Sequence, residues 1–138
     1  MSFAKRITAR IPEFCMSHWL IRIPLAIVFL QQGTSKLPFD PEDGAAFDLP
    51  ALVWWFVVYG EIGAGIGLLV GGLVLIKALS ELNDIITRFS GIVVCSIMTG
   101  VIWVGKPESL IDVLLHDNLH VFLWLGGLFF ALRGNHAK

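Results

Sequence analysis

The chain contains four apolar stretches that are separated by short segments rich in charged and turn-forming residues. A bilayer-spanning helix needs about 20 mainly apolar residues, and the fourth stretch reaches that length if part of 110–118 extends it. The pattern therefore predicts an all-α fold, a four-helix transmembrane bundle within a membrane domain over residues 16–138. The predicted spans are about 16–36, 49–76, 85–104 and 119–132.

Residues 1–15 have a different pattern, in which apolar and basic side chains alternate at helical spacing. Phe3 and Ile7 lie among basic residues, which is typical of an amphipathic segment on a membrane surface. Pro12 is expected to end this segment. The apolar run that follows ends in Gln31-Gln32-Gly33, which does not resemble a small-residue cleavage site. We therefore expect it to be retained as the first span.

The composition agrees with a membrane protein. Of 138 residues, 56% are hydrophobic and 15% are charged, and the mean hydropathy is +0.77. A soluble domain has roughly 45–50% apolar and ~25% charged residues, so a soluble fold is excluded. The formal net charge of -1 excludes nucleic acid as a partner, because binding phosphates needs a concentrated basic surface. The two cysteines, Cys15 and Cys95, form no C-x-x-C pair and are interpreted as packing residues.

Charge is distributed unequally between the two sides of the predicted spans. The positive-inside rule assigns the basic side to the cytoplasm. Both termini are therefore predicted to be cytoplasmic, and the expected location is the cytoplasmic (inner) membrane of a bacterium. The basic side comprises Lys5, Arg6, Arg10, Lys77, Arg133 and Lys138, whereas the other side has Asp40, Glu42, Asp43, Asp48, Glu108, Asp112 and Asp117 beside Lys36 and Lys106.

Two oppositely charged residues, Arg22 and Glu61, fall inside predicted spans. Inserting a charged side chain near the bilayer centre costs about 2.5–3.5 kcal/mol, so each of the two residues needs a partner or a water-filled cavity. Counted at 1.5 Å per residue from the outer ends of the first two spans, Arg22 lies about 21 Å deep and Glu61 about 18 Å deep. An antiparallel hairpin would bring them level, so a buried ion pair between them is predicted.

The sequence leaves the role of these charges open. Arg22 and Glu61 either bind a ligand and handle protons or only fix the helix register. Lys36, near the outer boundary, either joins them or extends its ammonium group to water. The candidate ligand-binding or proton-handling residues are Arg22, Lys36, Glu61, Gln32 and His120.

Metal and catalytic motifs are not evident. His116 and His120 lie four residues apart, but no third ligand accompanies them, so no metal site is predicted. No nucleophile elbow or phosphate-binding glycine loop is present, and no catalytic residue is assigned.

Helical projections predict which faces of the spans are buried. In the first span one stripe is expected to face the bundle interior, and in the third span a polar stripe is assigned the same role. The tryptophans are expected to anchor the chain at the membrane interfaces. The first stripe is Arg22, Ala26, Phe29, Gly33 and Lys36, the second is Arg88, Ile92, Cys95 and Thr99, and the tryptophans are Trp19, Trp54, Trp55, Trp103 and Trp124.

Glycines are concentrated in the second span, where their small size lets helix backbones approach closely. The predicted helix-packing glycines are Gly33, Gly63, Gly65, Gly67 and Gly71.

The pattern Arg22…Phe29…Gly33…Lys36, followed by the glycine-rich run that begins with Glu61-Ile62-Gly63-Ala64-Gly65, resembles the DoxX-like family of membrane proteins. The resemblance covers about residues 16–80 and implies a small four-helix membrane protein. Some members are described as subunits of thiosulfate:quinone oxidoreductase or of membrane oxidoreductase complexes linked to oxidative stress. By this resemblance the motif positions are Arg22, Lys36 and Glu61.

The leading functional hypothesis is a membrane subunit of a redox complex that binds a quinone or similar apolar molecule between its helices. Arg22 or Lys36 would donate hydrogen bonds to a carbonyl oxygen and Glu61 would relay a proton. Electrons would come from a partner subunit or a bound cofactor, so activity of the isolated chain is not expected. The alternative is a non-catalytic accessory or assembly subunit that packs against other membrane proteins, including further copies of itself. A small transporter is less attractive because no inverted repeat is visible.

Overall fold

The computed structural model describes residues 2–10, 16–73 and 76–135. In these ranges all regular secondary structure is helical, and turns and loops connect the helices. Pro12 and Cys15 lie outside them, so the predicted helix end at Pro12 stays a prediction. The elements are α1 (Phe3–Thr8), α2 (Trp19–Thr34), α3 (Pro41–Ala45), α4 (Ala51–Gly72), the 3₁₀ helix η1 (Lys77–Leu79), α5 (Ser80–Val104), α6 (Leu110–His116) and α7 (Asn118–Arg133).

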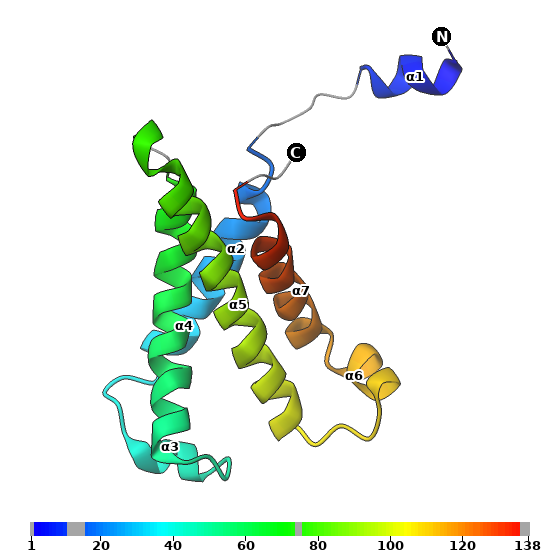
Figure 1. Cartoon of the computed structure of the whole chain (residues 1–138). Helices are drawn as coiled ribbons and strands as arrows, with labels where there is room; N and C mark the ends of the chain where they lie inside the picture. Colours follow the sequence, from blue (N-terminus) through cyan, green and yellow to red (C-terminus); the bar gives the residue numbers. More distant parts are fainter. Residues whose placement is uncertain (1, 11–15, 74–75, 136–138) are drawn as a thin grey trace.

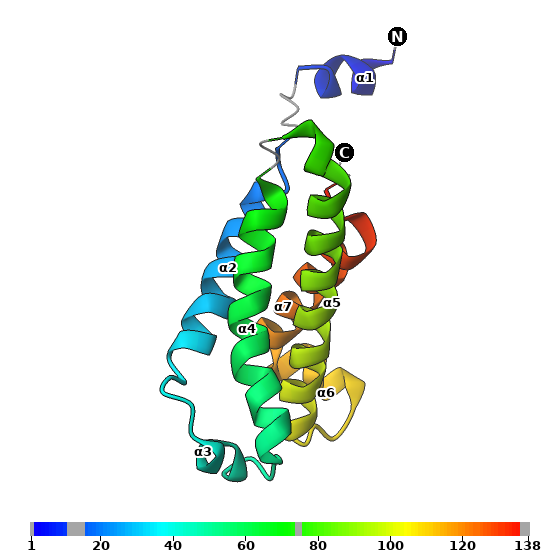
Figure 2. The ribbon, with the colours of Figure 1, turned by 60° about the vertical axis from the view of Figure 1, so that its left-hand side comes forward.

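Four helices pack in chain order, with α2 against α4, α4 against α5 and α5 against α7 (Figures 1 and 2). A smaller contact between α2 and α7 closes the arrangement. The start of α2 and the end of α7 lie at one end of the molecule, whereas α3 and α6 lie at the opposite end (Figure 1). The core between the helices comprises Leu25, Ala26, Phe29, Ala64, Leu68, Val94, Ile97, Met98 and Phe130.

The all-helical class predicted from the sequence is confirmed. α4 and the continuous segment Lys77–Val104 are each long and apolar enough to cross a membrane. α6 and α7 meet at a bend of 102° and provide a third candidate if they act together. α2 has 16 residues and is about 24 Å long, which is shorter than a hydrocarbon core of about 30 Å. Two or three candidate spans are therefore present in the described chain.

The predicted buried face is confirmed in α2 and wrong in α5. In α2 the residues Arg22, Ala26, Phe29 and Gly33 are all buried. In α5, Ile92 and Thr99 are exposed, and the buried face is instead formed by Asn83, Thr87, Ser90, Gly91, Val94, Ile97 and Met98. The prediction centred the buried face of α5 on the charged Arg88. In the structure the small and apolar residues next to Arg88 in helical projection form the buried face instead.

Glycines mark the closest approaches of the helices. A Cβ atom at Gly65 would lie 2.6 Å from Leu30 Cγ and 3.0 Å from the carbonyl oxygen of Ala26, so α2 and α4 touch there almost backbone to backbone. Gly67 and Gly71 approach the Ser90 and Thr87 hydroxyls of α5 in the same way. Gly63 has no other atom within 4 Å of such a Cβ position and lies on an exposed face of α4.

Candidate functional site

A buried ion pair joins α2 to α4 near the end of the helix pair where α2 ends and α4 begins. Lys36 Nζ lies 2.6 Å from Glu61 Oε2, and it also donates a hydrogen bond to the main-chain oxygen of Gln32 at 2.9 Å. The Glu61 side chain is 4% exposed and that of Lys36 is 20% exposed. The Glu61 side chain is thus enclosed, whereas the Lys36 side chain is partly exposed.

The position of this pair follows from the way α2 ends against α4. A Cβ atom at Gly33 would lie 2.6 Å from Ile62 Cγ1 and 3.1 Å from Glu61 Cβ. The missing side chain lets the last turn of α2 rest on α4 beside Glu61. Lys36, three residues later, then lies within reach of the carboxylate.

Trp54 completes the surroundings of the ion pair. Its ring lies 5.9 Å from Lys36 Nζ, and it packs beneath α3, where it contacts Gly44 and stacks with Phe47. Trp54 is 5% exposed, so its interpretation as an interfacial anchor is wrong, because α3 covers it. Its indole N–H is buried and has no hydrogen-bond partner among the described residues.

The predicted ion pair between Arg22 and Glu61 is wrong. Gly33 packs beside Ile62, and Arg22 lies eleven residues before Gly33, or about 16 Å along the helix. The prediction assumed that the first two spans end at the same height, and it measured the depths of Arg22 and Glu61 from those ends. In the structure the first turns of α4 extend well beyond the last turn of α2, so Glu61 meets Lys36 instead.

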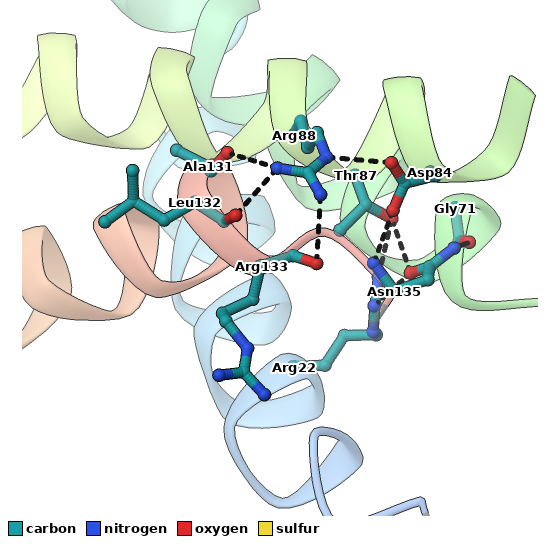
Figure 3. Close-up of polar contacts among 9 residues, drawn as sticks. All are labelled: Arg22, Gly71, Asp84, Thr87, Arg88, Ala131, Leu132, Arg133 and Asn135. Carbon is teal, nitrogen blue, oxygen red and sulfur yellow. Dashed lines mark hydrogen bonds and ion pairs between the residues drawn. The ribbon is translucent and has the colours of Figure 1, made fainter. Parts of the chain in front are cut away.

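Arg22 is fully buried at the opposite end of α2, where it binds uncharged acceptors. Nη1 donates to the Leu68 carbonyl oxygen at 2.6 Å and to Thr87 Oγ1 at 3.1 Å, Nη2 donates to Asn135 Oδ1 at 2.7 Å, and Nε donates to His18 Nδ1 at 3.1 Å. Its guanidinium carbon lies 4.7 Å from the centre of the Phe130 ring. Arg22 therefore connects α2, α4, α5 and the segment after α7, and Figure 3 shows it with Thr87 and Asn135.

Arg88 makes a second connection close by. Its Nε lies 2.7 Å from Asp84 Oδ2, and its remaining nitrogens donate to main-chain oxygens at the end of α7, including that of Leu132 at 2.7 Å (Figure 3). The last carbonyl groups of a helix lack partners within the helix, and a cation there also interacts favourably with the helix dipole. Arg88 thus fixes the end of α7 on α5.

The family model for DoxX matches residues 18–107, more than half of the chain. The chain belongs to the DoxX family. Neither the curated proteins nor the solved structures provide a match. The part matched to DoxX contains Lys36, Glu61 and Arg22, and it ends before α6, α7 and Asn135. Membership and the apolar helices together make this DoxX protein an integral membrane protein in contact with the lipid bilayer.

The candidate residues of this DoxX chain do not form one site. Lys36, Glu61 and the main chain of Gln32 come together, but Arg22 is at the other end of α2. His120 Nδ1 lies 2.5 Å from Asp117 Oδ1 at the start of α7, and His116 is paired separately with Asp112 at 2.8 Å. No group of three or more His, Cys, Asp or Glu residues that could hold a metal ion occurs in the described ranges.

Three residues of this DoxX chain that are central to the polar contacts were not identified from the sequence. Thr87 and Asn135 are uncharged, so they carry none of the cost that draws attention to an ionisable group in a membrane. Trp54 resembled an ordinary interfacial aromatic residue. The signal that was available is the position of Asn135, directly after Gly134 at the expected end of a helix.

An open hollow of about 400 Å³ lies beside the first turns of α4 in this DoxX chain, lined by Phe39, Ala51, Leu52 and Trp55. Two of the lining residues are aromatic, and the ring of Tyr59 lies near both, 5.0 Å from Trp55 and 6.1 Å from Phe39 between ring centres. Its apolar, aromatic lining is suited to a lipid-soluble ring system or an acyl chain.

Proposed function

We propose that this DoxX protein is the membrane subunit of a redox-linked complex and binds a quinone, or a similar apolar molecule with carbonyl groups, beside Lys36 and Glu61. The observation that supports the proposal is the pair itself, in which the ammonium group of a partly exposed lysine side chain lies 2.6 Å from an enclosed carboxylate. Sites for small apolar ligands commonly combine an apolar lining with a few such polar groups.

The residues around the pair fit the polar edge of such a ligand. Lys36 has donors to offer to a carbonyl oxygen, and the unpartnered indole N–H of Trp54 is a second donor nearby. A buried donor without a partner is costly, and a ligand oxygen would remove that cost. Glu61 is placed to exchange a proton through Lys36 when the ligand changes its redox state. A quinone would supply the electron-accepting chemistry, and the electrons would come from a partner subunit or its cofactor.

The aromatic hollow gives such a molecule an apolar surface at the same end of α2 and α4. Phe39 follows Lys36 by three residues, and Leu52 and Trp55 lie in the first turns of α4. A ring or acyl tail on this surface would leave a polar head group near Lys36. We propose that entry is from the lipid phase.

The proposed topology has four crossings, formed by α2, α4, α5 and the bent pair α6 and α7, with both termini in the cytoplasm of a bacterium. Lys77, Arg88 and Arg133 lie at the end where α2 begins, and the acidic segment around α3 lies at the opposite end. This distribution supports a cytoplasmic assignment for the first end by the positive-inside rule.

The test compares Glu61→Gln with Glu81→Gln, an equivalent change at an exposed position in the first turn of α5. Binding of a short-chain benzoquinone is measured by quenching of tryptophan fluorescence, and turnover is measured in the purified complex with that quinone as acceptor. Glu61→Gln is expected to lower turnover by about a hundredfold while the protein remains inserted, because proton transfer is lost. Glu81→Gln is expected to behave as the wild type. Unchanged turnover in an inserted Glu61→Gln protein would contradict the proposal.

The second candidate function is an accessory subunit that packs against other membrane proteins. It is favoured by the open surroundings of Gly63 on α4 and Gly100 on α5, both on exposed apolar helices with no atom within 4 Å of a Cβ position. Small residues on a lipid-facing surface permit close approach of another helix. Replacing both by leucine would reduce co-purification of partner subunits under this hypothesis and would leave quinone binding unchanged.

A further inference from the structure

α2 ends well short of the point where α4 begins, on the side of the molecule where α3 lies (Figure 2). Gly33, in the last turn of α2, packs against Ile62 of α4. Ile62 lies eleven residues after the start of α4 at Ala51, which is about 16 Å along the helix. Residues 51–62 of α4 therefore extend past the end of α2.

This first half of α4 belongs to a helix that is long and apolar enough to cross a membrane. Its exposed side chains include the apolar Leu52 and Phe56. α4 is about 33 Å long, close to the hydrocarbon thickness of about 30 Å, so its midpoint near Glu61 lies near the centre of the bilayer when α4 crosses it. The end of α2 lies at the same depth.

The chain that leaves α2 at this depth is mostly exposed, and residues 35–40 form no helix. Non-helical backbone at membrane depth is tolerated only where it is buried in protein or lines water. Since this segment is not buried, water is its expected neighbour. The side chains agree, because four exposed polar residues lie at the end of α2 and directly after it, namely Gln31, Gln32, Thr34 and Ser35.

The polar end of α2 leads directly to the ion pair. Lys36 follows it, and the Lys36 side chain is partly exposed. Lys36 Nζ donates to the main-chain oxygen of Gln32 at 2.9 Å and lies 2.6 Å from Glu61 Oε2. Polar groups therefore continue from the exposed end of α2 to the enclosed carboxylate.

In the opposite direction the interior of the bundle is apolar. The buried layer next to Glu61 comprises Ala26, Phe29, Ala64 and Leu68. Among the buried polar side chains of the described residues, the next one along α4 is Ser90, which lies beside Gly67, six residues or about 9 Å from Glu61. This apolar layer separates the ion pair from the polar network around Arg22.

We propose that water reaches the Lys36–Glu61 pair along the polar end of α2 from the side of the membrane on which α3 lies, and that the pair exchanges protons with that side alone. The path for water is argued from the helix lengths and the exposed polar residues. The use of these protons in redox chemistry rests on the proposed function. In the reduction of a bound quinone to the quinol, the partner subunit supplies two electrons and the pair passes on two protons from water on the α3 side.

The first test measures from which side a water-borne reagent reaches the end of α2. The full-length protein, with Cys15→Ser and Cys95→Ser, carries Gln32→Cys in membrane vesicles of either orientation. A charged methanethiosulfonate, which does not cross lipid, is added outside the vesicles, and the rate of modification is measured.

Three further single cysteines serve as controls in the same background. Glu42→Cys in α3 and Lys77→Cys in η1, both at exposed positions, report the two sides of the membrane. Ile27→Cys is the matched control for Gln32→Cys, because it changes an exposed apolar position of the same helix.

Gln32→Cys is expected to react only in the vesicles in which Glu42→Cys reacts, and about tenfold faster than Ile27→Cys, because a thiol must ionise in water before it attacks the reagent. A rate as low as that of Ile27→Cys would overturn the path for water, since lipid or another protein would then cover the end of α2. Reaction in both orientations would overturn its one-sidedness. Ser35→Cys, a nearly isosteric change at an exposed position, is used with the same criteria if Gln32→Cys does not insert.

The second test follows protons in vesicles that contain the purified complex and a pH indicator on one side at a time. Quinone reduction is expected to consume protons on the side that Glu42→Cys reports, and consumption on the side of Lys77→Cys would overturn the one-sided exchange. Unchanged turnover of Glu61→Gln would contradict the proposed function and the proton exchange but not the path for water. An unreactive Gln32→Cys with lost turnover in Glu61→Gln would remove the path and leave the quinone site.

Discussion

Lys36 and Glu61 form an asymmetric ion pair, in which the carboxylate is enclosed by the helices and the lysine reaches it from the edge. The Glu61 side chain is 4% exposed against 20% for Lys36. Glu61 therefore has few alternatives when the lysine is removed, whereas the lysine can turn toward the surface when the carboxylate is lost. The two single substitutions should have unequal effects.

We expect Lys36→Met to lower the free energy of unfolding by about 2–3 kcal/mol, because it leaves a buried carboxylate without its partner. Glu61→Gln should cost less, about 1 kcal/mol, since the lysine can find water. The double variant should be about 1–2 kcal/mol more stable than the sum of the single effects implies. Chemical denaturation in mild detergent measures the free energy of unfolding of the two single variants and the double variant. Additive effects would contradict a direct pair.

Gly33→Leu should disturb the contact between α2 and α4, because its Cβ alone would approach within 2.6 Å of Ile62. Overpacking of this kind costs about 1–3 kcal/mol. Gly63→Leu on the same helix pair is the control, and its unfolding free energy should change by less than about 0.5 kcal/mol. Thermal unfolding of both variants measures the two changes in unfolding free energy. Equal losses of stability would mean that Gly33 is not a position of close helix approach.

Arg22→Met should be among the most damaging single changes, because it leaves the Leu68 carbonyl, Thr87 and Asn135 without their shared donor. An unsatisfied buried acceptor costs about 1–3 kcal/mol, so a total loss of about 3–5 kcal/mol in the free energy of unfolding is expected. Thr87→Val removes one of these contacts and should cost about 1 kcal/mol. A small effect of Arg22→Met in an unfolding experiment would contradict the network described for it.

Gly134→Ala should destabilise the end of α7, since residue 134 has φ +56° and a Cβ there would collide with the Asp84 carboxylate. We expect a loss of about 1–2 kcal/mol. Gly100→Ala is the opposite case, because it lies in a helix with open space around it and should gain up to about 1 kcal/mol. Hydrogen exchange of the last turn of α7 would show whether the first effect is local.

Hydropathy located α2, α4, α5 and α7 as helical segments, because long apolar stretches stand out from the charged segments between them. The buried stripe of α2 could be predicted because its residues recur at helical spacing. The partner of Glu61 could not, because it depends on how far α4 extends past α2, which is fixed by Gly33 and by α3 covering Trp54. Thr87 and Asn135 were missed because their importance arises only when three distant segments meet at Arg22.

The bond between Arg22 and Asn135 joins residues 113 positions apart, and this distance has a consequence for biosynthesis. α2 leaves the ribosome long before residue 135 has been translated, so its arginine enters the translocon while one of its acceptors does not yet exist. On the proposed topology, nascent chains arrested before that residue should hold α2 less firmly in the bilayer than chains that extend beyond it do. Synthesis of the segment after α7 would then be the event that secures α2 in the membrane.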